Sequence, residues 1–436
     1  MFKDKKVIVV GMARSGISAA KALIKAGALV TVNDSKTDIE LDFEVEKDFG
    51  GPPSYLDYDF MVLSPGVPTD LPFVLEAKSK LKVIGALEVG YLLSKGQFYG
   101  ITGTNGKTTT TTLTYEIFKA AECDAYAVGN IGNSVASVAY DTTEKSHLIT
   151  EVSSFQLESV DQFKVHIAAI LNFAPDHLNR HKTMENYIES KCRIAENQTS
   201  DDYLLLNYDN EGTRTLDTKQ FESKVIYFSK TPIDQGFFID GDCIVAKFSR
   251  RVELLPLSLI RVPGDHNLEN ILAAVGIAYL AGVPIEAIHK AISEFRGVAH
   301  RIEYVGTHKG IKCYNDSKGT NPDSSIVAVK AMTAPTLLIA GGMDKGSEFD
   351  EFVSYFKNVK SLILLGETKE TIAEAAKKSG FDKIVYVENM EEAVEKAFEI
   401  GEAGDLLLLS PACASWDMYP SFEVRGEHFK SCLEKY

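Results

Sequence analysis

The residues Gly103-Thr-Asn-Gly-Lys-Thr108 have the types and spacing of a phosphate-binding loop. A buried strand pattern precedes them and a helix pattern follows, so backbone N–H groups and the helix N-terminus would face an anion. The amine of Lys107 can bridge terminal phosphate oxygens, and the hydroxyl of Thr108 can ligate Mg²⁺. The general loop pattern begins with glycine where this chain has Ile101. A tight turn with a surface lysine is the alternative. The residues predicted to hold the phosphates are Gly103, Thr104, Asn105, Gly106, Lys107, Thr108 and Thr109.

Two further predicted strands carry polar residues at or just beyond their ends. The strand 147–152 delivers Glu151, and the strand 167–173 leads to His177. Ligands of open α/β sheets bind beyond the carboxyl ends of the strands, so these side chains should meet the phosphate loop. A carboxylate there suits Mg²⁺ held between two phosphates. Histidine is a less usual ligand for this hard ion, so a capped structural histidine remains the alternative for His177.

Lys191 lies well inside a predicted helix that Thr183 begins as its N-cap. A lysine on a helix is usually solvated, and composition alone predicts that position for Lys191.

The elements that position these residues alternate between strand and helix, which favours an α/β fold with parallel sheets covered by helices. We predict three domains: a Rossmann-like N-terminal domain at 1–93, a central P-loop ATPase-type α/β domain at 94–297, and a C-terminal Rossmann-like α/β domain at 298–436. The predicted strands are 6–10, 29–32, 60–63, 98–102, 147–152, 167–173, 336–340, 362–365, 384–387 and 406–409, with further strand-like runs in 201–262. The predicted helices include 18–26, 108–121 and 266–280.

Length and composition agree with a soluble protein of several domains. The chain has 436 residues, and its formal net charge of −15 argues against nucleic acid or an anionic membrane as partner. We find no signal peptide and no run that could span a bilayer, and we expect a cytoplasmic protein. The six cysteines are scattered without a C-x-x-C pair, which fits reduced thiols and gives no zinc signature.

Three motifs together resemble the Mur ligase family: G-T-N-G-K-T, then E-V-S-S-F-Q at 151–156, then N-F-A-P-D-H-L-N-R-H at 172–181. The family's loop does not need the first glycine, which accounts for Ile101. The C-terminal stretches N-D-S-K-G-T-N-P at 315–322 and L-S-P-A-C-A-S-W-D at 409–417 resemble the branch that adds D-glutamate. The resemblance implies an ATP-dependent amide ligase that joins D-glutamate to UDP-N-acetylmuramoyl-L-alanine through an acyl phosphate, in peptidoglycan precursor synthesis. We expect a monomer.

The resemblance also assigns roles to residues of the central domain. ATP would bind with two Mg²⁺ ions, the first on Thr108 and Glu151, the second on His177 and Lys191. Lys191 would be carbamylated, which turns an ammonium into a carboxylate-like oxygen ligand. The catalytic residues would be Lys107, His177 and Lys191, and the base for the attacking amine is not assigned, since a histidine that holds metal is a poor base. The adenine contacts would be Asn267 and Asn270.

For the third domain, the resemblance implies that Arg301 and Asp316 reach the nucleotide. Each D-glutamate residue has a plain alternative: Lys345 as a solvated loop lysine, Ser415 as a helix cap and Phe422 as a core aromatic. The residues implied for D-glutamate are Thr320, Lys345, Ser415 and Phe422.

The first domain resembles the family's unit for the UDP-sugar. Its turn, Gly11-x-Ala13-x-x-Gly16, has alanine where a dinucleotide fingerprint has its middle glycine, so this fingerprint is weak evidence for NAD. The residues implied for the UDP-sugar are Arg14, Ser15, Asp34, Ser35, Lys36, Gly66, Asn130, Ser153 and His177.

Three other functions remain open at this point. One is an amide ligase of the same family with another amino acid. The second is a switch that hydrolyses ATP without ligation, and the third is an NAD-binding regulator.

Overall fold

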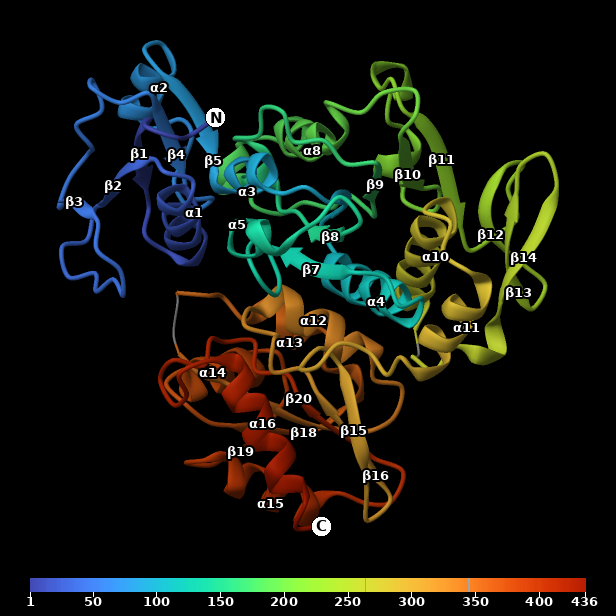
Figure 1. Cartoon of the computed structure of the whole chain (residues 1–436). Helices are drawn as coiled ribbons and strands as arrows, with labels where there is room; N and C mark the ends of the chain where they lie inside the picture. Colours follow the sequence, from blue (N-terminus) through green and yellow to red (C-terminus); the bar gives the residue numbers. More distant parts are fainter. Residues whose placement is uncertain (263, 344–345) are drawn as a thin grey trace. The chain divides into compact units, whose positions relative to one another are not determined.

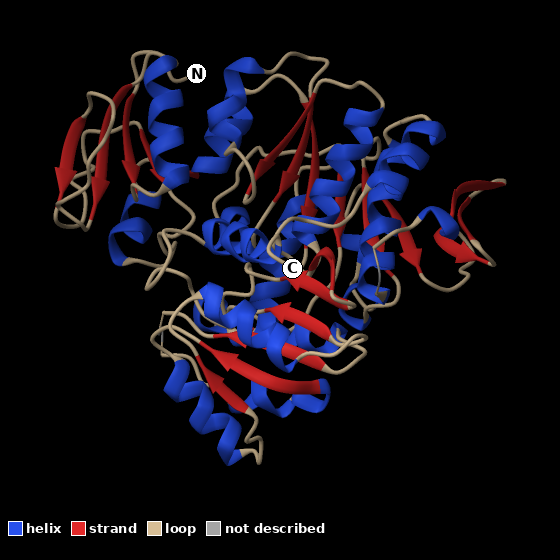
Figure 2. Ribbon diagram, turned by 90° about the horizontal axis from the view of Figure 1, so that it is seen from below, coloured by secondary structure: helices blue, strands red, loops and turns tan. Residues whose placement is uncertain are grey.

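The computed structural model describes residues 1–262, 264–343 and 346–436. Its strands form three separate sheets (Figure 1), and Figure 2 shows helices lying along them. Contacts divide the chain into two compact units, Met1–Phe295 and Arg296–Tyr436. The first unit holds two of the sheets, and the second holds one. The mixed α/β fold with three sheets confirms the predicted fold class. The boundaries at 93/94 and 297/298 stay predictions.

The N-terminal sheet is parallel throughout, in the order β3-β2-β1-β4-β5. Successive residues of its central strand are buried on opposite faces: Val7 and Val9 with helices α1 and α3, Ile8 and Val10 with α2. The elements are β1 (Lys6–Val10), α1 (Arg14–Lys25), β2 (Leu29–Asp34), β3 (Glu46–Phe49), β4 (Phe60–Leu63), α2 (Pro72–Lys78), β5 (Lys82–Gly85) and α3 (Ala86–Leu93).

Helix α1 begins at Arg14, four residues before the predicted start. The glycine turn is short because Gly11 and Gly16 nearly touch: a Cβ on Gly16 would lie 1.9 Å from the Gly11 carbonyl oxygen. The helix therefore starts inside the turn motif and not after it.

The central sheet has nine strands in the order β14-β13-β12-β11-β10-β9-β6-β8-β7. It is parallel from β7 to β12, and β13 and β14 add an antiparallel edge. Strand β6 lies between β8 and β9, so the loop after β6 is flanked by the ends of both neighbours. The strands are β6 (Gln97–Thr102), β7 (Ala125–Gly129), β8 (His147–Glu151), β9 (Ile167–Ile170), β10 (Tyr203–Asn207), β11 (Lys224–Ser229), β12 (Gly236–Asp240), β13 (Cys243–Lys247) and β14 (Arg251–Pro256).

Helices cover the central sheet. Helix α4 packs against α10 and α11, while α6 and α8 contribute to the core that contains β9 and β10 residues. The helices are α4 (Lys107–Ala120), α5 (Val135–Val138), α6 (Ser154–Leu157), α7 (Leu178–His181), α8 (Met184–Cys192), α9 (Glu211–Arg214), α10 (Asp265–Leu280) and α11 (Ile285–Glu294).

Strand β9 ends at Ile170, three residues before the predicted end. Beyond it, Asn172 turns to the phosphate loop, where its carbonyl accepts from the N–H of Thr104 at 3.0 Å and its Oδ1 accepts from the N–H of Asn105 at 2.8 Å. Asn172 bonds to the phosphate loop instead of a neighbouring strand. The strand therefore ends before the apolar run in the sequence does.

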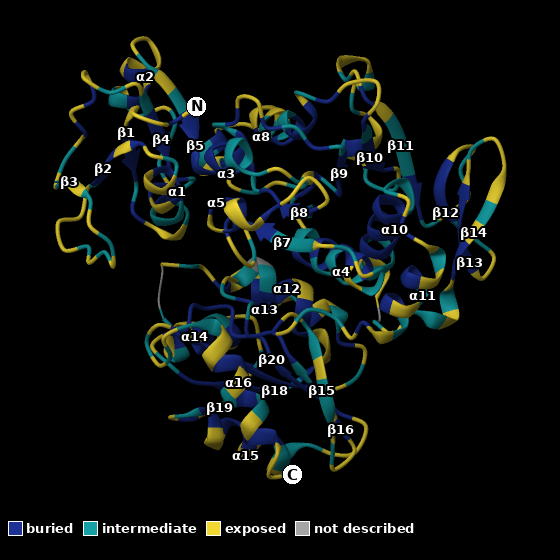
Figure 3. Ribbon diagram, in the orientation of Figure 1, coloured by how far each residue is buried: buried dark blue, intermediate teal, exposed yellow. Residues whose placement is uncertain are grey.

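The second unit contains the sheet β15-β16-β20-β17-β18-β19, antiparallel only between β15 and β16. Strand β20 buries Leu406 and Leu408 on one face and Leu407 and Leu409 on the other, so both faces are covered, as the dark ribbon of β20 in Figure 3 shows. The elements are β15 (Glu303–His308), β16 (Ile311–Asn315), α12 (Pro322–Ala331), β17 (Thr336–Ala340), α13 (Asp350–Ser354), β18 (Val359–Leu364), α14 (Lys369–Lys378), β19 (Ile384–Tyr386), α15 (Met390–Ile400), β20 (Leu406–Leu409) and α16 (Phe422–Leu433).

Within the described residues, no helix combines the length and apolar character that a membrane crossing requires.

Candidate active site

The phosphate loop leaves β6 and curls around the side chain of Lys107. The Lys107 amine donates to the carbonyls of Gly103 at 2.8 Å and Thr104 at 2.7 Å. Gly106 has a left-handed backbone (φ 84°), and a Cβ there would lie 2.2 Å from Oδ1 of Asn270. A larger residue is therefore excluded at this point, and the loop has the close-packed form that a phosphate site needs.

Glu151 ends β8, directly beside Ile101 in the register of β6. Its carboxylate is buried, with 1% of the residue exposed. Oε1 accepts from the side-chain amide of Asn130 at 2.9 Å, whereas the buried Oε2 has no hydrogen-bond partner within the described ranges. A buried carboxylate oxygen without a partner costs free energy. This oxygen therefore fits a bound cation.

Lys191 is buried with 2% of the residue exposed, so the prediction of a solvated lysine is wrong. Its amine donates to the Gly103 carbonyl at 2.8 Å and lies over the Tyr187 ring at 4.8 Å from the centroid. Burial, together with the charge of nearby Lys107, holds the pKa of Lys191 well below its usual range. Helix α8, with its predicted Thr183 cap, points this residue at the loop and not into water.

His177 is partly exposed, and its backbone is left-handed (φ 53°) at the start of the short helix α7. Its Nε2 lies 3.4 Å from Oδ2 of Asp176, and its ring lies 4.8 Å from that of Phe155. The histidine is therefore presented on a surface beside a carboxylate, which is not the environment of a buried structural histidine.

A cavity of about 220 Å³ lies between Lys107, Lys191 and His177; Glu151 does not line it, but Asn130, which binds its Oε1, does. Its lining contains six of the predicted residues: Gly66, Lys107, Asn130, Ser153, His177 and Lys191. Sequence reasoning missed Pro65, Ser154, Phe155, Asp176 and Tyr187, which also line it. Three of the missed residues lie next to predicted ones, and Phe155 lies two positions after Ser153. Tyr187 lies one helical turn before Lys191, so spacing alone could have found all five.

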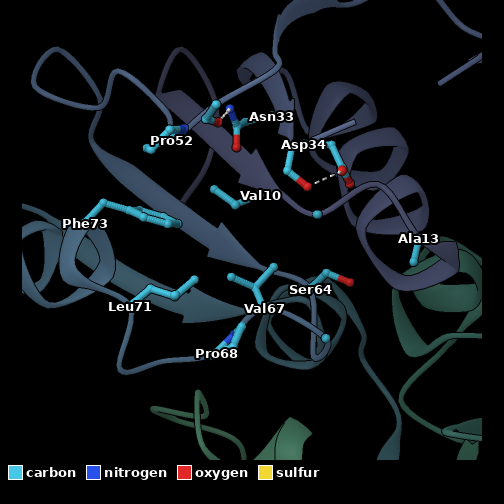
Figure 4. A pocket seen from close by; sticks show the side chains of 14 residues that line it. Val10, Ala13, Asn33, Asp34, Pro52, Ser64, Val67, Pro68, Leu71 and Phe73 are labelled. Carbon is cyan, nitrogen blue, oxygen red and sulfur yellow. Dashed lines mark hydrogen bonds between the residues drawn. The ribbon is translucent and has the colours of Figure 1, made fainter. Parts of the chain in front are cut away.

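A second cavity, of about 460 Å³, lies at the carboxyl ends of β1, β2 and β4. Asp34, Ser35 and Gly66 are the predicted residues in its lining. Figure 4 shows Leu71 and Phe73 along one wall, and these apolar residues were not predicted. Gly66 lines both cavities, so the loop that carries it separates the two sites.

The carboxylate of Asp34 accepts a hydrogen bond from the glycine turn. Partial burial opposes ionisation, but hydrogen bonds from the N–H groups of Met12 (2.7 Å) and Lys36 (3.0 Å) lower the pKa of the Asp34 carboxyl overall. Arg14, Ser15 and Lys36 do not line the larger cavity. The Arg14 guanidinium instead donates to the carbonyl of Gly132 at 3.0 Å.

Asn270 and Asn267 lie at the start of α10. Asn270 is buried, and its Oδ1 accepts from the hydroxyl of Thr110 at 3.3 Å while packing against Gly106. This amide supports the phosphate loop from the α10 side. A contact of Asn267 or Asn270 with adenine stays a prediction.

The predicted residues of the second unit gather around the ends of β16 and β20, and Lys345 lies outside the described residues. Burial raises the pKa of Asp316 to about 7, and its carboxylate accepts from the Ser410 hydroxyl at 2.8 Å. Arg301 is close enough to Asp316 to favour its charged form. All the described residues of this set lie in the second unit: Arg301, Asp316, Thr320, Ser415 and Phe422.

Two plain alternatives in this unit fail. The N-cap of α16 is Ser421 and not Ser415, which is buried. Phe422 is the first residue of α16 and is only half-buried, so it is not a core aromatic.

Arg425 is a buried residue of this unit to which sequence reasoning assigned no role. Its buried guanidinium donates to the carbonyls of Ser317, Cys413 and Ala414, and burial lowers its pKa to about 10. It joins the loops after β16 and β20 that carry the motif residues.

Known proteins resemble this chain over nearly its whole length. The Mur ligase middle domain matches residues 101–278, and the Mur ligase glutamate ligase domain matches residues 300–413. The UDP-N-acetylmuramoylalanine–D-glutamate ligase of Clostridioides difficile (strain 630) is 49% identical over 442 residues, covering 98% of both chains. The enzyme of the same name from Alkaliphilus metalliredigens (strain QYMF) is 46% identical, covering 99% of this chain and 98% of its own.

Solved structures share the fold at low sequence identity. UDP-N-acetylmuramate-alanine ligase MurC from Thermotoga maritima superposes with a TM-score of 0.60 at 18% identity, covering 99% of each chain. MurF ligase from Thermotoga maritima, solved in complex with ADP, gives 0.57 at 17% identity, covering 100% of this chain and 96% of its own. The family domains and the near-full-length relatives together show that this chain belongs to the Mur ligase family.

Proposed function

We propose that this protein is an ATP-dependent ligase that joins D-glutamate to UDP-N-acetylmuramoyl-L-alanine in peptidoglycan precursor synthesis. The observation that carries the proposal is its identity of 42–49% to enzymes named UDP-N-acetylmuramoylalanine–D-glutamate ligase, over 98% or more of this chain. An amide ligase of the same family that uses another amino acid is therefore less favoured. Neither an ATP-hydrolysing switch nor an NAD-binding regulator accounts for these relatives. We propose that it acts as a monomer in the cytoplasm.

The two cavities lie on either side of Gly66, and each suits a different part of the substrates. The larger cavity, with Asp34 and Ser35, would take the uridine end of the sugar nucleotide. The sugar nucleotide would extend past Gly66. Its alanyl carboxylate would then lie in the smaller cavity, beside Lys107, Asn130 and His177. The phosphate loop at that cavity would hold ATP.

In the reaction, an alanyl carboxylate oxygen attacks the γ-phosphorus of ATP, and the bond to ADP breaks. The amine of D-glutamate then attacks the acyl carbon and loses a proton, and inorganic phosphate leaves with the former carboxylate oxygen. Lys107 neutralises charge between the carboxylate and phosphates that would otherwise repel each other. The loop orients the phosphate for in-line attack, and this positioning supplies much of the rate.

The residues around the smaller cavity also fit Mg²⁺. The test is the buried Oε2 of Glu151, which has no partner among the described residues and is the kind of oxygen that this ion prefers. Thr108 and Glu151 would hold one ion, and His177 and Lys191 the other. When bound, Mg²⁺ would act as a Lewis acid that neutralises charge on the phosphoryl group.

Lys191 can serve that second site only as a carbamate. Its uncharged amine would attack CO₂, forming an N–C bond and releasing one proton. Its burial beside Gly103 supports this modification, since an ammonium there would repel a cation.

The test is phosphate release from Mg-ATP with UDP-N-acetylmuramoyl-L-alanine, with and without D-glutamate, together with mass detection of the product. Release that needs both substrates, with a product heavier by one glutamyl residue, supports the proposal. Competition among L-alanine, D-glutamate and L-lysine tests the amino acid. Release that ignores D-glutamate, or that occurs only with another amino acid, overturns it.

A further inference from the structure

The segment that carries His177 is not held by its own backbone. Helix α7 has only four residues, and non-glycine residues with left-handed backbone flank it, His177 (φ 53°) and Lys182 (φ 71°). Such residues persist only where their surroundings fix them. The position of His177 therefore depends on side-chain contacts that α7 makes with other elements.

Two residues of α7 make these contacts: buried His181, whose Nε2 lies 2.9 Å from the Ser154 hydroxyl, and Arg180. Nη2 of Arg180 lies 2.6 Å from Oε2 of Glu158, and its Nε lies 3.2 and 3.3 Å from the two carboxylate oxygens. The guanidinium also lies over the ring of Phe155 at 4.9 Å. Both partners of the pair are largely buried, with side-chain exposures of 14% and 13%. The pair ties α7 to α6, which follows Glu151 in the chain.

The same pair reaches the N-terminal sheet. Nη2 of Arg180 donates to the carbonyl of Val67 at 3.1 Å, and Oε2 of Glu158 accepts from the hydroxyl of Thr69 at 3.4 Å. Val67 follows Gly66, the residue that lines both cavities. One guanidinium, carried by the segment with His177, therefore contacts both Glu158 at the end of α6 and the loop between the two cavities.

We propose that Arg180 and Glu158 form a positioning pair that fixes the loop 64–68 against the His177 segment. The pair thereby holds the sugar-nucleotide site in a fixed position relative to the phosphate site. This inference rests on the proposed function of the two cavities. Neither residue lines either of the two cavities described, so the pair acts through Gly66 and His177.

Lysine cannot replace Arg180 in this arrangement. An ammonium has no planar fork, so it cannot bind both carboxylate oxygens and the Val67 carbonyl in fixed directions. Arg180→Lys keeps the charge and removes the geometry. Glu158→Gln keeps the shape and removes the charge.

Arg251 offers a control at the surface, with 42% of its side chain exposed. Its guanidinium also pairs with carboxylates in the first unit, Asp240 at 2.9 Å and Glu253 at 2.8 Å, and it lines neither cavity. Arg251→Lys therefore reports the general effect of replacing a paired arginine.

The experiment uses the full chain with Arg180→Lys, Glu158→Gln, the double variant and Arg251→Lys. We expect Arg180→Lys and Glu158→Gln each to raise the KM for the UDP-sugar and the Mg²⁺ concentration for half-maximal rate about tenfold. The KM for ATP should stay near wild type. The double variant should lose no more than the larger single loss, since the two residues act as one unit.

The proposal is overturned if Arg180→Lys behaves like Arg251→Lys, or if the two single losses multiply in the double variant. A fall in thermal midpoint without a change in KM would assign the pair a structural role only. Calorimetric binding of the UDP-sugar is measured in parallel without D-glutamate. If wild type binds the UDP-sugar but ligates no D-glutamate, the proposed reaction fails, and weaker binding by Arg180→Lys still tests the pair.

Discussion

Replacing Lys191 with alanine tests the most consequential difference between sequence and structure. The lysine amine touches the carbonyl of Gly103, so it stands at the phosphate loop and not on a solvated helix face. If the carbamate of this lysine holds a cation, its loss removes one oxygen ligand. We expect Lys191→Ala to lose most ligase activity.

The magnitude follows from the charge that the ligand would place at the site. A metal ion at a phosphoryl group stabilises the transition state by several kcal/mol, and losing about 3–4 kcal/mol lowers kcat about 10²–10³-fold. The fold should change little. Removing about three buried methylene groups costs roughly 2–3 kcal/mol, and removing a buried amine offsets part of this cost. The thermal midpoint should therefore stay within about 5 °C of wild type.

The assay is ligation rate with and without a short carboxylic acid, which can supply the missing oxygen ligand. Partial recovery with the acid, and none with chloride salts or bicarbonate, is the expected pattern. Lys119→Ala is the control, because Lys119 is an exposed lysine of α4. Full activity in Lys191→Ala, or equal recovery with chloride, would refute the reasoning and leave this lysine a structural role.

Three further outcomes are expected. Glu151→Gln should raise the Mg²⁺ concentration for half-maximal phosphate release at least tenfold without lowering the thermal midpoint, because its Oε2 has no protein partner within the described ranges; an unchanged Mg²⁺ titration contradicts this. Gly16→Ala should lose about 1–3 kcal/mol of unfolding free energy in urea, since its Cβ would clash with a backbone oxygen at 1.9 Å, whereas Gly51→Ala, with open space at its Cβ, should not. Burial opposes ionisation of Asp202, but hydrogen bonds from Lys164, His166 and Thr199 lower its pKa from 3.8 to about 2. Its charged form then stabilises the fold above pH 4, and this contribution is lost as pH falls through about 2. Asp202→Asn should therefore cost about 1–2 kcal/mol at pH 7, after discounting for solvent at the half-exposed Lys164, and nothing below pH 2; a pH-independent difference contradicts it.

Local patterns were sufficient for most of the fold. Strands β1, β4, β17 and β20 have the predicted bounds, because short continuous apolar runs between turn residues favour buried strands of a covered sheet. The phosphate loop was predicted for a similar reason, since glycine spacing and the following helix define it within a few residues. The short strands β3 and β5 were not predicted, because Glu46–Phe49 and Lys82–Gly85 mix charged and apolar residues. Sheet pairing, and not local propensity, makes them strands.

What the sequence alone determined, then, is the α/β fold, the phosphate loop and, through its motifs, the Mur ligase family. Only the tertiary structure decided the environment of each polar side chain. Lys191 is buried against Gly103, 88 positions away, and Arg180 meets Val67 across 113 positions. That Oε2 of Glu151 has no partner among the described residues likewise depends on which residues surround it. Burial and hydrogen bonding are sums over neighbours from distant segments, so no local pattern contains them.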